Sequence, residues 1–394
     1  MINKKAQAKM KKLSIYIHIP FCVRKCLYCD FLSAPTEREV MDRYVNALCR
    51  EIIKKSSICK EYIITTVFIG GGTPSILSGE RIEKIIRTVR ENYQMEAGCE
   101  ISIEANPGTI TPDKLESWRR AGINRLSIGL QSAQNNELKA LGRIHSFEDF
   151  LYTYKMIVKS GFDNINIDLM SAIPKQTIAS WQETLKAVCS LNPPPVHISA
   201  YSLIVEENTP FYENTPKLPE EDEERNMYKI TNDILFDMGY MQYEISNYAK
   251  PGYECRHNQV YWRRGNYLGF GIGAASMVEN VRYSNIRELG SYIHFCEGGL
   301  DAIEKTSLNH LSEKEQMEEF MFLGLRMTEG VCEEDFYRIF GASIEEIYPE
   351  IVEDFCRKGL LKRKFNRKTG EHWIMLTRYG IDVSNTVMAE FLLS

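Results

Sequence analysis

The sequence has no apolar run long enough to cross a membrane, although 44% of its 394 residues are hydrophobic. Its first residues carry lysines but lack the apolar core and small-residue cleavage site of a signal peptide. Positive charge is not in excess, because 48 Lys and Arg face 53 Asp and Glu, for a net charge of −5. These absences argue against membrane-spanning, secreted and nucleic-acid-binding proteins. We expect a globular cytoplasmic protein, with peripheral membrane contact left open.

A disulfide framework is also missing. The chain has 11 cysteines, an odd number, and only Cys22, Cys26 and Cys29 are clustered. The others follow no repeated spacing, so most of them are expected to be small buried side chains or surface thiols. Cys255 is kept as a candidate ligand because it stands close to a histidine motif.

Short β-branched segments alternate with amphipathic ones from residue 13 onward, which predicts βαβ units and a parallel sheet. The expected strands are 14–19, 65–70, 100–105, 125–130, 164–169 and 197–204. The expected helices between them are 37–57, 79–93, 111–121, 133–141, 147–160 and 178–190. Six such units are fewer than the eight of a closed (β/α) barrel, so the predicted fold is α/β with a partial barrel.

Four parts of the chain are expected. Residues 1–12 form a flexible polar tail, 13–215 the partial barrel, 216–305 an extension, and 306–394 a small, mainly helical C-terminal module. The extension begins with a helix at 222–239, whereas 241–282 has no clean helical period. In the module we expect helices 312–328, 333–340, 343–358 and 379–392, with a hairpin at 360–377.

The three clustered cysteines have the spacing C-x3-C-x2-C directly after the first strand. Three thiolates on one loop can hold three corners of a [4Fe–4S] cluster and leave the fourth iron open. A structural zinc site usually needs a fourth ligand and a second cysteine pair. A redox C-x-x-C would explain Cys26 and Cys29 but not Cys22. The spacing favours the cluster, with zinc and chance clustering as the alternatives.

Polar residues gather at the expected strand ends, where barrels of this type carry their active sites. Gly70-Gly71-Gly72-Thr73 follows the second strand, and its glycines allow a ligand to approach the backbone closely. It is not a Walker A loop, because no Gly-Lys-Ser/Thr follows. Glu104, Gln131 and Asp168 close the next three strands. A tight turn and solvated strand-end residues are the alternative interpretations.

The cysteine spacing, with aromatic Tyr28 before the third cysteine, resembles the signature of the radical S-adenosylmethionine (SAM) superfamily. The resemblance implies a partial (β/α)6 barrel, a [4Fe–4S] cluster on Cys22, Cys26 and Cys29, and SAM on its open iron. The order and spacing of the polar residues resemble the coproporphyrinogen III oxidase branch. That likeness implies a SAM site made of Tyr16, Tyr28, Gly71, Gly72, Thr73, Glu104, Gln131, Arg143 and Asp168.

Two kinds of protein in this branch remain as alternatives: the oxygen-independent coproporphyrinogen III oxidase and the HemW-type haem chaperone. The oxidases carry a fourth cysteine two residues after the third, and Phe31 stands there in this chain. The sequence is therefore more similar to the haem chaperones, which implies haem as cargo and haem proteins as recipients. The missing thiol argues against oxidase activity.

A second feature supports this likeness. His257-Asn258-Gln259-Val260-Tyr261-Trp262 resembles the H-N-x-x-Y-W motif of the haem chaperones. A neutral imidazole is a sound haem ligand, and the aromatic rings offer flat apolar surface. The resemblance implies that His257, Asn258, Tyr261 and Trp262 contact haem, with neighbouring arginines pairing with propionates. A buried aromatic turn with a fully hydrogen-bonded histidine is the alternative.

Overall fold

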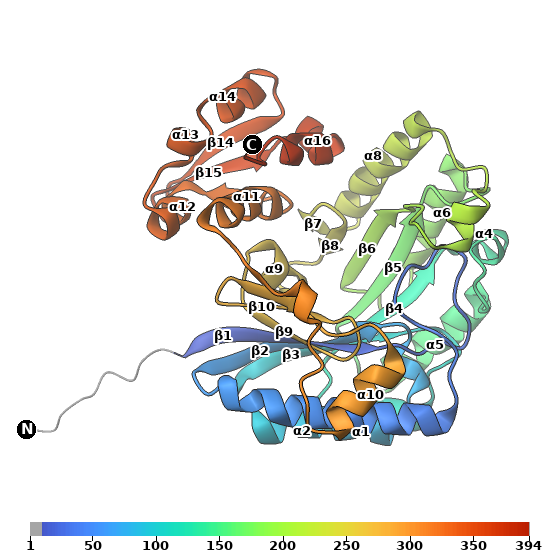
Figure 1. Cartoon of the computed structure of the whole chain (residues 1–394). Coiled ribbons are helices and arrows are strands. Elements are labelled where there is room, and N and C mark those ends of the chain that lie inside the picture. Colours follow the sequence, from blue (N-terminus) through green and yellow to red (C-terminus); the bar gives the residue numbers. More distant parts are fainter. Residues whose placement is uncertain (1–9, 394) are drawn as a thin grey trace, which may run out of the picture.

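The computed structural model describes residues 10–393, which are built around one 12-stranded sheet (Figure 1). Its centre consists of six parallel strands in sequence order, as predicted. These strands are β1 (Lys11–Ile19), β2 (Tyr62–Gly71), β3 (Met95–Ala105), β4 (Arg125–Gln131), β5 (Ile165–Ser171) and β6 (His197–Ser202). Lys11 and Lys12 belong to β1, so the expected tail is too long, and its residues 1–9 lie outside the described part of the chain.

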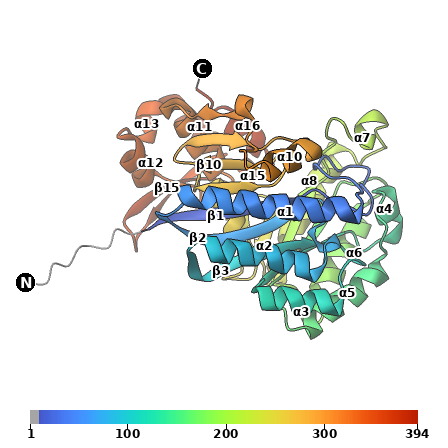
Figure 2. The ribbon, with the colours of Figure 1, turned by 60° about the horizontal axis from the view of Figure 1, so that its bottom comes forward.

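Helices connect the strands and cover one face of the sheet. They are α1 (Arg38–Lys55), α2 (Gly79–Asn92), α3 (Pro112–Ala121), α4 (Asn135–Ala140), α5 (Phe147–Lys159) and α6 (Ile178–Cys189). Helices α1, α2 and α3 lie side by side over β1 to β3 (Figure 2). The order of strands and helices therefore confirms the partial α/β barrel.

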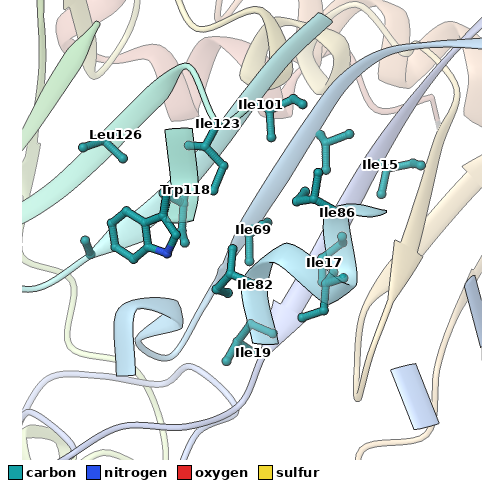
Figure 3. Close-up of a cluster of buried hydrophobic side chains, with 14 of the residues drawn as sticks. Ile15, Ile17, Ile19, Ile69, Ile82, Ile86, Ile101, Trp118, Ile123 and Leu126 are labelled. Atoms are coloured by element: carbon teal, nitrogen blue, oxygen red, sulfur yellow. The ribbon is translucent and has the colours of Figure 1, made fainter. Parts of the chain in front are cut away.

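The main core lies between these helices and the sheet. Alternate residues of β1 (Ile15, Ile17 and Ile19) point toward α2, where Ile82 and Ile86 meet them (Figure 3). The opposite faces of the same strands turn inward. This alternation lets each strand bury apolar side chains on one face and carry polar groups into the barrel interior on the other.

The extension lengthens both edges of the sheet instead of forming a layer of its own. Beyond β6 lie β8 (Asn247–Ala249) and β7 (Met241–Glu244), and beyond β1 lie β9 (Tyr267–Phe270), β10 (Ala275–Val278), β11 (Val281–Ser284) and β12 (Asn309–His310). Its helices are α7 (Pro210–Glu213), α8 (Glu221–Asp237), α9 (Arg256–Trp262) and α10 (Leu289–Glu297). Strands of three or four residues are too short for their alternation to be recognised in the sequence.

The C-terminal module has its own hydrophobic core. It contains α11 (Glu313–Gly324), β13 (Val331–Cys332), α12 (Glu333–Phe340), α13 (Ile344–Ile347), α14 (Pro349–Arg357), β14 (Leu361–Asn366), β15 (Glu371–Leu376), α15 (Arg378–Asp382) and α16 (Ser384–Ala389). The predicted hairpin is present as β14 and β15. Two predicted helices are wrong as single elements. Pro349 starts a new helix within 343–358, and the chain leaves helical geometry at Val383 within 379–392.

Among the described residues, no helix combines the length and apolar character needed to span a bilayer.

Candidate functional site

The three clustered cysteines lie on the loop between β1 and α1, and all three line one cavity of about 320 Å³. Their thiols are free. The Cys22 Sγ atom lies 3.3 Å from the Thr73 hydroxyl, and Arg143 Nη1 lies 3.6 Å from Cys26 Sγ. Loop and strand ends therefore bring the thiols together with the residues predicted to bind SAM.

The donor set fits a cluster better than a single ion. Among residues 10–393, no three Cys, His, Asp or Glu side chains converge on one metal-sized point. A cubane presents separate iron corners, so thiolates spread around a cavity suit it. Burial raises the pKa of Cys29 to about 11, so this thiol is protonated at neutral pH in the metal-free protein. Iron binding must therefore release that proton.

Most of the predicted SAM residues line the same cavity. They are Tyr28, Gly71, Gly72, Thr73, Glu104, Gln131, Arg143 and Asp168. They come from the loop after β1, from the carboxyl ends of β2, β3 and β4 and the loops beyond, and from the middle of β5, where Asp168 lies. Apart from Asp168, they follow the barrel rule. Tyr16 is the exception, because it lines an adjoining hollow of about 280 Å³ and its hydroxyl lies 3.0 Å from His18 Nδ1. The SAM assignment of these residues stays a prediction.

Gly71 has a backbone conformation that other residues rarely adopt, with φ at +107°. A Cβ atom there would lie 2.5 Å from the ring of His18. That ring cannot easily move away, because its nitrogens lie 3.0 Å from the Tyr16 hydroxyl and 2.8 Å from the Leu32 carbonyl oxygen. The backbone at Gly71 is therefore open toward the cavity only while residue 71 has no side chain.

We expect Gly71→Ala to destabilise the protein by about 1–3 kcal/mol from backbone strain and to weaken SAM binding as well. Gly98→Ala is the matched control, because Gly98 also has a positive φ but a Cβ there would meet nothing within 4 Å. Thermal unfolding and equilibrium dialysis with labelled SAM measure the two effects. Equal SAM affinity in both variants would contradict a role for the Gly71 backbone.

Two carboxyl groups face the cavity. Glu104 accepts a hydrogen bond of 3.0 Å from the Gly71 amide, and Asp168 accepts bonds from Ser127 and Asn166. Burial, helped by the negative charge of Asp168, raises the pKa of Glu104 to about 8. Burial also raises the pKa of Asp168. The cavity thus holds two buried acids that gain from hydrogen-bond donors, such as the hydroxyls of a ribose.

The raised pKa of Glu104 predicts a pH-dependent stability. Between pH 4.5 and 8 the native state keeps a proton that the unfolded state has lost, so stability falls as pH rises through this range. We expect Glu104→Gln to raise the stability of the cluster-free protein by about 1–2 kcal/mol at pH 8.5, since cavity water screens part of the charge. Calorimetry at pH 5 and 8.5 tests this, because the gain should vanish at pH 5.

Helix α9 carries the H-N-x-x-Y-W motif and is fixed by a buried carboxylate. Glu100 on β3 accepts hydrogen bonds from the backbone amides of Arg256 (3.2 Å) and His257 (3.1 Å). A negative charge at the first turn of a helix is favourable. This contact fixes His257, Asn258 and Tyr261 along the wall of the 280 Å³ hollow, and Asn258 also lines the cavity of the cysteines.

His257 is buried and both of its ring nitrogens have partners. Nδ1 lies 2.7 Å from the Thr66 hydroxyl, and Nε2 lies 2.8 Å from the Tyr261 hydroxyl. Because Thr66 donates its own proton to Ser14, the network assigns the imidazole proton to Nδ1 and leaves Nε2 to accept from Tyr261. Burial lowers the pKa of His257 to about 3, so the ring is neutral. Its metal-binding lone pair is present but occupied by Tyr261.

The other residues considered for haem binding are Trp262, Cys255 and the neighbouring arginines, and the structure places each of them differently. Trp262 does not line the hollow, because it packs toward the C-terminal module with Arg326 4.2 Å above its ring. Cys255 lines the hollow, but burial raises its pKa to about 12, which keeps it a thiol. The arginines near the motif already have carboxylate partners, in the pairs Arg256–Glu96, Arg263–Glu329 and Arg264–Glu319.

Two residues of the site were not singled out from the sequence. His18 supports the Gly71 backbone, as described above. Asn106 follows β3 and joins two predicted residues, because it donates to the Thr73 hydroxyl (2.9 Å) and accepts from Arg143 (2.8 Å). Its place just after a strand end was the available signal.

Comparison with known proteins identifies the relatives of this chain. The Radical SAM superfamily matches residues 16–188, and the HemN C-terminal domain matches residues 311–367. The heme chaperone HemW of Bacillus subtilis is 36% identical over 385 residues, covering 96% of this chain and 99% of the relative. The heme chaperone HemW of Escherichia coli is 35% identical and covers 98% of this chain and 99% of the relative.

The fold resembles coproporphyrinogen III oxidase (HemN) of Escherichia coli, a radical SAM enzyme, with a TM-score of 0.83. That match has 24% identity and covers 97% of this chain and 90% of the oxidase, so it establishes the fold alone. The radical SAM match implies a [4Fe–4S] cluster and SAM as the cofactors of this protein. On near full-length similarity, the chain belongs to the HemW family of radical SAM proteins.

Proposed function

We propose that the protein binds haem and delivers it to haem proteins, with a SAM-coordinating [4Fe–4S] cluster in its barrel. The observation that carries this proposal is the near full-length similarity to relatives that are named heme chaperones. Phe31 supports it, because an exposed phenylalanine at the cavity rim replaces the fourth cysteine expected of an oxidase. The cluster and SAM would supply electron-transfer and radical chemistry if SAM is cleaved.

We propose His257 as the haem ligand, with Asn258 and Tyr261 beside it, whereas Trp262 faces away from the hollow. The imidazole is neutral, which suits it to iron, but the hydroxyl of Tyr261 must turn away before Nε2 can bind a metal. Because breaking the hydrogen bond from Tyr261 costs free energy, we expect two neighbouring variants to behave differently. His257→Ala should weaken haem binding, whereas Tyr261→Phe should leave it unchanged or strengthen it.

The test is a parallel assay on the anaerobically reconstituted protein. Haem addition should give a Soret band that His257→Ala reduces and Tyr261→Phe does not. Coproporphyrinogen III with SAM and a reductant should remain unconverted. Formation of protoporphyrinogen IX without haem binding would establish the oxidase instead. A Soret band that His257→Ala leaves intact would show that the protein binds haem but that His257 is not the ligand.

A cytoplasmic location is part of the same proposal. All 11 cysteines are free thiols, as suits a reducing compartment. Delivery to haem proteins and any peripheral contact with a membrane remain predictions, which pull-down with a haem-loaded protein and vesicle sedimentation would measure.

A further inference from the structure

The hollow in front of His257 and the cavity of the cysteines are two halves of one space. The cysteine half is lined by Gly72, Thr73 and Arg143, and the histidine half by Phe68, His197 and Tyr261. Both are lined by Phe31, Glu104, Asp168 and Asn258. The two halves therefore adjoin, since the same side chains form part of the wall of each.

From this we infer that SAM and haem compete for one cavity, so that bound SAM keeps haem from His257 and bound haem displaces SAM. This inference rests on the proposed haem binding at His257. Three observations carry it: the shared wall, the size of the two halves, and the position of the free positive charges.

The size of the space limits what it can hold at once. The halves measure about 320 and 280 Å³, while single ligand sites usually occupy about 300–1,000 Å³. A tetrapyrrole is a large flat ligand, and the volume of the half before His257 alone falls just below the range usual for drug-sized ligands. A macrocycle whose iron meets Nε2 must therefore extend into the half lined by the cysteines, where SAM is expected.

The charges point the same way. The arginines beside the motif are paired with Glu96, Glu329 and Glu319, and the pair of Arg264 with Glu319 is buried. Arg24 and Lys25, between the cluster cysteines, line the cysteine half and are exposed. SAM carries a carboxylate and haem carries two propionates, and carboxylates seek such cations. Arg143 also lines the cysteine half, whereas Arg125 lines the histidine half and bonds to Asn164 and the Tyr253 carbonyl. Three of the four cations of the space therefore lie in the cysteine half, where the carboxylates of both ligands can reach them.

The consequence is a two-state cycle without a ternary complex. Since the two ligands exclude each other, SAM raises the apparent haem Kd in proportion to its own concentration divided by its own Kd, and haem does the same to SAM. Loading with cargo would then release SAM, and the SAM-bound form would be the form that holds no haem at His257.

The experiment titrates the cluster-reconstituted full chain with haem, without SAM and with saturating SAM. We expect SAM at about ten times its own Kd to raise the apparent haem Kd by about tenfold, and haem to displace labelled SAM in dialysis. An unchanged haem Kd together with one SAM and one haem on the same chain would overturn the inference. Absence of any haem binding would instead end the proposed function, so the two failures are distinct.

A double variant of the exposed cations Arg24 and Lys25 tests whether SAM and haem use the same charges. Arg24→Gln with Lys25→Gln should weaken both SAM and haem binding while the iron content stays unchanged. Lys362→Gln is the control, because this exposed residue lies on β14 in the C-terminal module. A double variant that weakened only SAM binding would overturn the shared-charge argument.

Discussion

Replacing Cys26 by alanine is expected to lower the iron content of the anaerobically reconstituted protein from about four atoms per chain to about none, because a site-differentiated cluster depends on all three thiolates. The Cys26 thiol faces the cavity and lies 3.6 Å from Arg143 Nη1. Its loss removes a ligand without opening a hole in the hydrophobic core. Iron and sulfide analysis, with the brown absorbance of the cluster, measures the result.

The matched control for this substitution is Cys189→Ala on α6, which makes the same chemical change at a partly buried thiol that does not line the cavity. It should retain iron and colour. The cluster assignment fails if Cys26→Ala keeps iron and sulfide, or if the unaltered protein stays colourless and takes up zinc instead.

The parallel strands and the rim of the site could be predicted because both follow from local patterns. Glu104, Gln131 and Asp168 each close a strand in the sequence, and parallel strands bring their carboxyl ends to one edge. Cys22 and Thr73 meet for the same reason, since the first two strands are neighbours. No long-range information beyond the order of strands was needed to bring these residues together.

The environment of His257 could be predicted only in part. Tyr261 stands four residues along in the same motif, but the other partners come from distant elements. Thr66 lies in the middle of β2, and Glu100, which caps α9, lies on β3. Nothing local in the motif indicates that the imidazole is neutral and doubly hydrogen-bonded. The sequence therefore left haem ligation and a buried, fully hydrogen-bonded histidine as equal alternatives. The structure adds that haem can reach Nε2 only after the hydrogen bond from Tyr261 is broken.

The edge strands were missed for a related reason. Residues 241–282 contain strands of three or four residues that are stabilised by pairing with β1 and β6 and not by their own pattern. One residue that holds this edge in place is Glu51 on α1. In the sequence it is an ordinary acidic residue of an amphipathic helix.

Glu51→Ala is expected to lower the free energy of unfolding by about 3–5 kcal/mol, the cost of leaving a buried charge without its partner. The Glu51 carboxylate is buried and accepts from Lys55 Nζ (2.7 Å), Asn285 Nδ2 (2.7 Å), the Gly271 amide (2.9 Å) and the Tyr292 hydroxyl (2.6 Å). These donors join α1 to the β9–β10 edge and to α10. Denaturant unfolding of the cluster-free protein measures the loss.

The control is Glu83→Ala, which breaks the more exposed pair with Arg120 and should cost no more than about 1 kcal/mol. Adding Lys55→Met to Glu51→Ala separates the effect of the unpaired charge from the effect of lost packing. The second substitution removes the buried ammonium that Glu51→Ala leaves without a partner. If the unpaired charge dominates, the double variant should regain a large part of the stability lost. If the Gly271, Asn285 and Tyr292 donors dominate, no recovery should follow, and Glu51 would then act chiefly as a hydrogen-bond acceptor that fixes the edge of the sheet.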